Sequence, residues 1–319
     1  MQEQGHLITV VIPTYNEAAR IDATVGAVVG YLESVENRYR WELIVVDDGS
    51  TDDTLTIAEK RAEADPRVRV AAHPANFKLG QALRYGFSLA KGDYLVVLDA
   101  DLSYDPDHIG RLVEVLDTTR AKVVIASPYM DGGRTSGVPR MRLAASRMAN
   151  RLLASAAKGN LTTITGMVRG YDAVFLRRLD LKAMDAEINA EIIYKAQLMR
   201  ASIVEIPAHL TWTRTEDAPR RFRPGRSISA FAFVSFLFRP YAFFLVPSAS
   251  VLVIAMGLFA FAAMSGRDDP SVGVLIAAST AAIVAAILGG MAVLSAQMKR
   301  YFEELFHLGT ASRTEKPPA

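Results

Sequence analysis

The chain has 319 residues and contains no cysteine, which excludes disulfide bonds, cysteine-ligated metal sites and a thiol nucleophile. Its net charge of +2 gives no sign of a polyelectrolyte partner such as nucleic acid. The N-terminal apolar run, residues 7–12, is short and has no basic segment before it. We therefore do not expect a signal peptide at this end.

Charge is absent from two long apolar stretches, Tyr241–Met264 and Ser271–Gln297. Each would extend over about 36 Å or more as a helix, at ~1.5 Å per residue, and a hydrocarbon core is roughly 30 Å thick. These stretches predict two transmembrane helices; the alternative is a helical hairpin buried in a soluble protein. Arginines between 220 and 239 precede the first stretch, and Lys299 and Arg300 follow the second. The positive-inside rule then places both ends in the cytoplasm.

Apolar runs rich in valine and isoleucine alternate with helix-like segments along residues 7–126. This alternation predicts an α/β domain with a mainly parallel sheet. The runs are almost continuously apolar, as expected for strands that are covered on both faces. We expect strands at 7–12, 42–46, 68–72, 94–98 and 123–126, and helices near 17–36, 52–64, 79–91 and 106–118.

Polar residues follow three of these strands, as PTYNE at 13–17, DDGS at 47–50 and DAD at 99–101. Ligands of open α/β sheets bind outside the carboxyl ends of the strands, so five carboxylates are expected at one edge. Each cluster alone has a structural alternative, as a helix N-cap or as an acidic first turn.

The pair Asp99 and Asp101 carries the most specific signal. Residues i and i+2 of an extended segment face the same side, and two like charges there repel unless a cation lies between them. Hard divalent ions take carboxylate oxygens together with phosphate oxygens of a substrate. The pair therefore predicts a Mg²⁺ or Mn²⁺ site that holds a diphosphate.

Acidic residues are absent from Gly132–Tyr171, a stretch that carries seven lysines and arginines. Such a surface attracts anions. Membrane lipid headgroups and a lipid phosphate are the expected partners. Nucleic acid is a poorer candidate, because aromatic residues are not interleaved with the cations.

VVIPTYNE, IVVDDGSTDDT, DYLVVLDADLSYDP, TGMVRGY and AEIIYKA together resemble family 2 glycosyltransferases, which have the GT-A fold. Within that family the sequence is most similar to the polyprenyl-phosphate and dolichyl-phosphate glycosyltransferases, such as dolichyl-phosphate mannose synthases. The resemblance implies a metal-dependent, inverting transfer of one sugar to a polyprenyl or dolichyl phosphate. The donor would be a nucleotide sugar such as GDP-mannose or UDP-glucose, with mannose preferred.

The resemblance also assigns residues. Asp99 and Asp101 would bind the metal and act in catalysis with Arg169, and the lipid phosphate would be bound by Arg134, Arg142 and Ser146. The nucleotide-sugar pocket would comprise Pro13, Thr14, Tyr15, Asn16, Glu17, Asp47, Asp48, Lys78 and Ala100.

The expected organisation is a GT-A catalytic domain at 1–226, an interfacial juxtamembrane helix at 227–239, a transmembrane hairpin at 240–298 and a partly disordered cytoplasmic tail at 299–319. The catalytic domain would lie on the cytoplasmic face of the plasma membrane or an equivalent membrane. Gly289 and Gly290 could pack helices closely, either in a homo-oligomer or within the chain.

Three positions depart from the family pattern: Ser103 stands for glutamine, Pro128 for arginine and Thr163 for an acid. They motivate an alternative function, a catalytically inactive membrane scaffold that binds nucleotide sugar. A processive polysaccharide synthase is disfavoured because the QxxRW motif is absent. A soluble nucleotidyltransferase is disfavoured by the two expected spans.

Overall fold

The fold is known from a computed structural model of the full chain, which describes residues 5–156, 161–212, 240–264 and 272–314. The chain divides into two compact units, Met1–Ala230 and Phe231–Ala319, which are described separately. The expected juxtamembrane helix at 227–239 lies outside the described residues.

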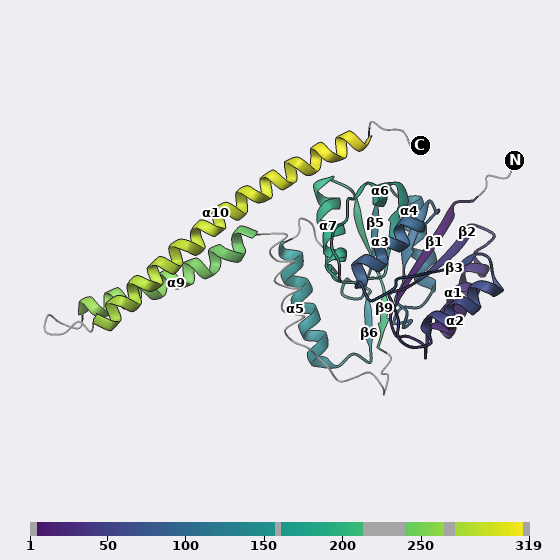
Figure 1. The fold of residues 1–319 in the computed structure, drawn as a ribbon, viewed down its shortest axis with the longest axis horizontal. Coiled ribbons are helices and arrows are strands. Elements are labelled where there is room, and N and C mark those ends of the chain that lie inside the picture. The colour runs from purple at the N-terminus through teal and green to yellow at the C-terminus, as the bar shows by residue number, and fades with distance from the viewer. Residues whose placement is uncertain (1–4, 157–160, 213–239, 265–271, 315–319) are drawn as a thin grey trace. The chain divides into compact units, whose positions relative to one another are not determined.

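The first unit is built on a seven-stranded sheet with the strand order β3-β2-β1-β4-β7-β5-β8 (Figure 1). All neighbours pair in parallel except β7, which is antiparallel to both β4 and β5. The strands are β1 (Leu7–Thr14), β2 (Arg40–Asp47), β3 (Val68–Ala72), β4 (Tyr94–Val97), β5 (Val123–Ser127), β7 (Arg169–Asp172) and β8 (Ile203–Pro207). The predicted α/β class with a mainly parallel sheet is confirmed.

The first four helices of this unit correspond to the predicted helical segments, and three further helices follow them in the chain. They are α1 (Ile21–Ser34), α2 (Thr54–Ala64), α3 (Leu79–Leu89), α4 (Asp107–Thr118), α5 (Arg140–Ala156), α6 (Ala173–Arg178) and α7 (Ile188–Leu198). A small parallel sheet joins β6 (Arg134–Ser136) to β9 (His209–Thr211). The five predicted strands all form, and the helix expected near 17–36 begins at Ile21.

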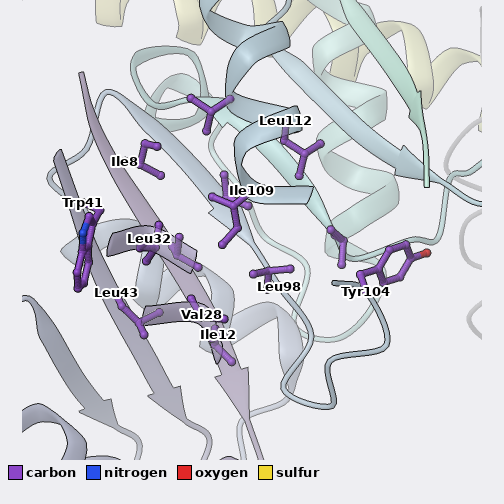
Figure 2. Packing of buried hydrophobic residues seen from close by; sticks show 14 of the residues in the cluster. Ile8, Ile12, Val28, Leu32, Trp41, Leu43, Leu98, Tyr104, Ile109 and Leu112 are labelled. Atoms are coloured by element: carbon purple, nitrogen blue, oxygen red, sulfur yellow. The ribbon is translucent and has the colours of Figure 1, made fainter. Parts of the chain in front are cut away.

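The main core lies between the sheet and helices α1 and α4 (Figure 2). Helix α4 buries Ile109, Leu112 and Leu116, whose spacing places them on one stripe of the helix. Alternate residues of β1, such as Ile8 and Ile12, face this core.

Helix α3 contacts β1 and β2. A Cβ added to Gly86 of α3 would lie 2.6 Å from Cγ1 of Val11 and 3.1 Å from Cγ2 of Val46. A real Cβ does not fit at the first distance. Only glycine therefore lets this helix approach the sheet so closely.

The second unit contains α9 (Pro240–Met264) and α10 (Val272–Thr314). Both are long and apolar enough to cross a membrane, and only 11% of each apolar window is buried within the structure. Core helices of soluble proteins are mostly buried, so the exposure of these helices favours lipid as their surroundings. Helix α10 continues past residue 298, where the hairpin was expected to end.

Small residues bring α9 and α10 together. Buried alanines recur at intervals of seven, at Ala255 and Ala262 in α9 and at Ala278, Ala285 and Ala292 in α10. Ser248 Oγ donates to the Ala285 carbonyl at 2.8 Å. The heptad spacing and short side chains allow close backbone approach.

The two glycines singled out in the sequence differ in their surroundings. A Cβ on Gly289 would lie 3.4 Å from Ser248 Oγ, within the same hairpin, whereas a Cβ on Gly290 would have no described atom within 4 Å.

Gly86→Ala should destabilise the protein by about 1–3 kcal/mol through overpacking against Val11. The matched control is Gly30→Ala in α1, where an added Cβ meets nothing within 4 Å. The control should be stabilised by about 0.5–1 kcal/mol, since alanine favours a helix over glycine. Urea unfolding in detergent, followed by fluorescence of the buried Trp41, measures both variants. Shifts of the same sign and size would contradict the close approach of α3.

Candidate functional site

The loops after β1 and β2 are joined by hydrogen bonds. Asn16 N donates to Ser50 Oγ at 2.9 Å, and Thr51 N donates to Asn16 Oδ1 at 2.8 Å. Asp48 N donates to the Thr14 carbonyl at 2.8 Å. The structure thus brings the PTYNE and DDGS segments together at one edge of the sheet.

Asp48 shapes a third segment, residues 73–78. Its Oδ1 accepts from Phe77 N and lies 2.9 Å from His73 Nδ1, and its Oδ2 accepts from Lys78 N at 2.8 Å. The carboxylate is almost fully buried. Both of its oxygens are occupied, so these contacts favour a role in holding the 73–78 segment over direct contact with a ligand.

Asp47 differs from its neighbour. Its Oδ2 accepts from Ser50 N at 3.0 Å, whereas its buried Oδ1 has no hydrogen-bond partner in the described part of the chain. A buried acceptor without a donor costs about 1–3 kcal/mol. Asp47 is therefore the better placed of the two to accept a hydrogen bond from a ligand.

The loops at this edge contain strained backbone. Asn16, Lys78 and Leu102 adopt positive φ angles of 57°, 80° and 51°, a conformation that non-glycine residues rarely adopt. Gly49 has a φ of 69°, and a Cβ there would lie 2.3 Å from the Ala75 carbonyl carbon. Strain of this kind concentrates at functional sites.

Asp99 and Asp101 follow β4 at the same edge. Asp101 Oδ1 accepts from Ser103 N at 2.9 Å, and Ser103 Oγ lies 3.5 Å from Asp99 Oδ2. Burial, together with the negative charge of Asp101, raises the pKa of Asp99 to about 7. Burial also raises the pKa of Glu17. The positive charge of Arg20 lowers this pKa, and the negative charges of Asp101 and Asp52 raise it. Side chains from the ends of β1 and β4 therefore interact electrostatically.

The carboxylate pair suits a divalent cation. The pKa of Asp99 is raised by burial and by the negative charge of Asp101, and a cation bound between the two carboxylates would offset that repulsion. No cluster of three or more metal-ligating side chains (His, Cys, Asp or Glu) occurs in residues 5–156, 161–212, 240–264 and 272–314. The described residues thus offer two carboxylates, and Ser103 contributes a hydroxyl close to Asp99.

Ala100 lies between the two acids and is itself buried. Its carbonyl accepts from Thr24 Oγ1 of α1 at 2.7 Å. Helix α1 therefore fixes the backbone of the Asp-Ala-Asp segment.

Residues predicted for the lipid phosphate lie on α5 and β6. Ser146 Oγ is 2.8 Å from the Tyr129 hydroxyl, and the Arg142 guanidinium stacks 4.0 Å from the centre of the Trp212 ring. Arg134 is exposed on β6. One turn of helix separates Arg142 from Ser146, so both face the same side of α5.

Arg169 lies in the interior. Its guanidinium donates to the carbonyls of Gly166 (2.7 Å), Asn189 (2.7 Å) and Ile164 (2.5 Å). The residue has no exposed surface, and desolvation lowers the pKa of its guanidinium. These contacts favour a positioning role over the predicted contact with reacting groups.

Asn150 was not singled out in the sequence. It is buried on α5, where its Oδ1 accepts from Ile164 N at 2.8 Å and from Thr165 N at 3.2 Å. It lies four residues after Ser146, and this spacing on a helix could have indicated from the sequence that Asn150 lies on the same face as Ser146.

Comparison with known proteins agrees with this geometry. The model of glycosyl transferase family 2 matches residues 9–180. A polyprenol monophosphomannose synthase of Mycolicibacterium smegmatis is 34% identical over 65% of this chain and 77% of its own. An undecaprenyl-phosphate mannosyltransferase of Micrococcus luteus is 34% identical over 63% of this chain and 82% of its own. The fold and its edge of carboxylates define a family 2 glycosyltransferase, and the chain belongs to that family.

Solved structures agree on the fold. Glucosyl-3-phosphoglycerate synthase from Mycobacterium tuberculosis, in complex with Mn²⁺, UDP and phosphoglyceric acid, superimposes with a TM-score of 0.54. The alignment covers 72% of this chain and 77% of that chain, at 24% identity. The similarity places the first unit among GT-A folds, as the sequence predicted.

Asp99 should make the metal-free protein less stable as the pH rises. Its pKa is about 7 in the folded state and near 3.8 in an unfolded chain. Between these values the folded state binds more protons, so stability falls with increasing pH until Asp99 is ionised. In EDTA, Asp99→Asn should flatten this dependence and raise Tm by at least about 2 °C near pH 8.

Thermal unfolding in EDTA from about pH 5 to about pH 8 measures this effect. The matched control is Asp131→Asn, at an exposed position. Mg²⁺ or Mn²⁺ should stabilise the wild type more above pH 7 than below it, since an ionised carboxylate binds the cation. An unchanged pH profile in Asp99→Asn would contradict the assignment.

Proposed function

We propose that the protein transfers one sugar, with mannose preferred, from a nucleotide sugar to a polyprenyl phosphate, with inversion at the anomeric carbon. The product is a lipid-phosphate monosaccharide. The observation that carries the proposal is the meeting of Glu17, Asp99 and Asp101 at one sheet edge of a family 2 domain. The names of the two mannosyl-transferring relatives support the choice of sugar and acceptor.

The donor nucleotide binds along the loops that follow β1 and β2. The free Oδ1 of Asp47 accepts an N–H of the base, which restores the hydrogen bond that this oxygen lacks. Tyr15 is exposed beside this segment and offers a ring for the base or ribose. Pro13, Thr14 and Asn16 complete the pocket with Lys78.

Asp99 and Asp101 would hold Mg²⁺ or Mn²⁺, and the ion would supply positive charge to the nucleoside diphosphate leaving group. The names of the fold neighbours, which were solved with Mn²⁺ or Mg²⁺ and UDP, support a divalent ion in this fold. Because the pKa of Asp99 is about 7 without a cation, this carboxyl group would release a proton when it takes up the ion near neutral pH.

The acceptor needs little activation. A phosphate oxygen is already ionised near neutral pH, so the reaction does not depend on a general base. The protein contributes alignment and charge stabilisation instead. Arg142 and Ser146, one turn apart on α5, bind the lipid phosphate, and Arg134 replaces the cation that the family has in the place of Pro128.

The membrane supplies the acceptor. Helices α9 and α10 anchor the chain, and the catalytic unit lies on the cytoplasmic face, where nucleotide sugars are made. Helix α5 exposes Met141 and Met148, at 88% and 63%, among arginines. An apolar ridge with cationic neighbours suits the headgroup layer of a bilayer.

Turnover tests the function directly. Purified protein would receive radiolabelled GDP-mannose, UDP-glucose or UDP-GlcNAc, undecaprenyl or dolichyl phosphate, and Mg²⁺ or Mn²⁺. We expect a labelled, mild-acid-labile lipid that disappears with EDTA and falls at least about 100-fold in Asp101→Asn. No lipid product with any donor, while nucleotide still binds, would replace this proposal with the inactive scaffold.

Arg142→Gln should raise the KM for the lipid phosphate by about 10-fold, because a charge-assisted contact to phosphate is lost. The matched control, Arg140→Gln, removes the same charge from an exposed position on the same helix and should change this KM by less than about 3-fold. The KM for the nucleotide sugar should not move in either variant. Equal effects of the two variants on this KM would contradict a specific contact of Arg142 and would indicate that α5 attracts the lipid phosphate only through its overall positive charge.

A further inference from the structure

In segment 162–166, four amides and two carbonyls are bound by three side chains from three elements. Glu205 of β8 accepts from the amides of Thr162 and Thr163. Asn150 of α5 accepts from the next two amides, and Arg169 of β7 donates to the carbonyls of residues 164 and 166. We call these three residues the loop clamp.

Within the loop clamp, Glu205 binds the start of the segment through three hydrogen bonds. Its Oε1 accepts from Thr163 N at 2.7 Å, and its Oε2 accepts from Thr162 N at 2.8 Å and from Thr162 Oγ1 at 2.9 Å. Three donors converge on one carboxylate. This arrangement suits a structural acceptor and leaves little capacity for proton transfer.

A chain of hydroxyl contacts continues from the clamped segment to α5. Ser127 Oγ lies 2.7 Å from the hydroxyls of both Thr162 and Thr163, and it accepts from Tyr129 N at 3.3 Å. The Tyr129 hydroxyl in turn lies 2.8 Å from Ser146 Oγ. The carboxylate of Glu205 is thereby linked to the proposed lipid-phosphate residue.

The same segment leads to the metal side of the site. β7 begins at Arg169, which pairs with Val97 at the end of β4. Because these strands are antiparallel, the residues just before Arg169 lie at the edge that carries Asp99 and Asp101. A shift of the clamped segment would therefore change the spacing between the two halves of the site.

We propose that Glu205 is a positioning residue that sets the alignment of the lipid phosphate with the sugar donor. The inference rests on the proposed function. Its basis is the geometry: the carboxylate of Glu205 accepts three hydrogen bonds from Thr162 and Thr163, at the start of the segment that leads to β7.

Glu205→Gln tests the proposal with little change in volume. The glutamine amide presents one acceptor and one donor to three hydrogen-bond donors, so at least one contact is lost. We expect kcat to fall by about 10- to 100-fold from misalignment, while the KM for the nucleotide sugar stays within about 2-fold. Glu114→Gln, at an exposed position on α4, is the matched control and should behave as the wild type.

Thr162→Val provides a second variant, which removes the hydroxyl between Ser127 and Glu205 and keeps the backbone. It should lower kcat in the same direction, again with the nucleotide-sugar KM unchanged. Thr163→Asp alone should be impaired, since it adds a second negative charge beside Glu205. Combined with Glu205→Gln, it should recover part of the lost kcat, because one carboxylate again serves the segment.

Hydrogen exchange gives a measurement that does not need turnover. The amides of residues 162–165 should exchange at least about 10-fold faster in Glu205→Gln than in the wild type. Unchanged exchange, unchanged kcat or an equal loss of nucleotide binding would each overturn the proposal. Absence of turnover in the wild type would instead overturn the proposed function, and the exchange result would still decide the role of Glu205.

Discussion

Repulsion between Asp99 and Asp101 is the constraint around which the carboxyl edge of the sheet is organised. Burial, and secondly this repulsion, raise the pKa of Asp99 to about 7. Among the described residues, no lysine or arginine forms an ion pair with either acid. The fold holds the pair through backbone contacts, with Thr24 fixing Ala100 and Ser103 N bound to Asp101. Such a pair is unfavourable alone and becomes favourable with a cation, so the edge is prepared for a charged ligand.

Much of the fold could be predicted because its first half follows simple periodic patterns. Strands β1, β2, β4 and β5 are largely buried apolar runs, and helices α1, α3 and α4 each bury an apolar stripe. Strand β7 could not be recognised in this way, because it begins with a buried arginine and contains glycine. Helix α7 buries Glu191 and Lys195, which satisfy each other at 2.6 Å. From the sequence pattern alone, these two charged residues are expected to be exposed. Their burial follows from the ion pair that they form in the folded structure.

The site was predictable to the level of segments. Parallel strands end at the same edge, so the convergence of the polar clusters follows from the sheet alone. The roles of single residues do not follow from it. Asp47 and Asp48 are adjacent in sequence, yet Asp48 is occupied by amides about 30 residues away and Asp47 keeps one oxygen unpaired. Arg169 matches a family position, but its guanidinium donates to three backbone carbonyls in the interior.

These features point to alignment as the main contribution of the protein to the proposed reaction. An ionised phosphate acceptor needs no base, so rate depends on holding two anionic substrates in contact despite their repulsion. In the proposed reaction, a cation at Asp99 and Asp101 would offset charge on the donor side, and the arginines of α5 and β6 would offset it on the acceptor side. The distance between these two regions would then be critical, and we assign it to segment 162–166, which is hydrogen-bonded to β5, β7 and β8. A segment with four amides and two carbonyls bound by side chains resists displacement better than a solvated loop would.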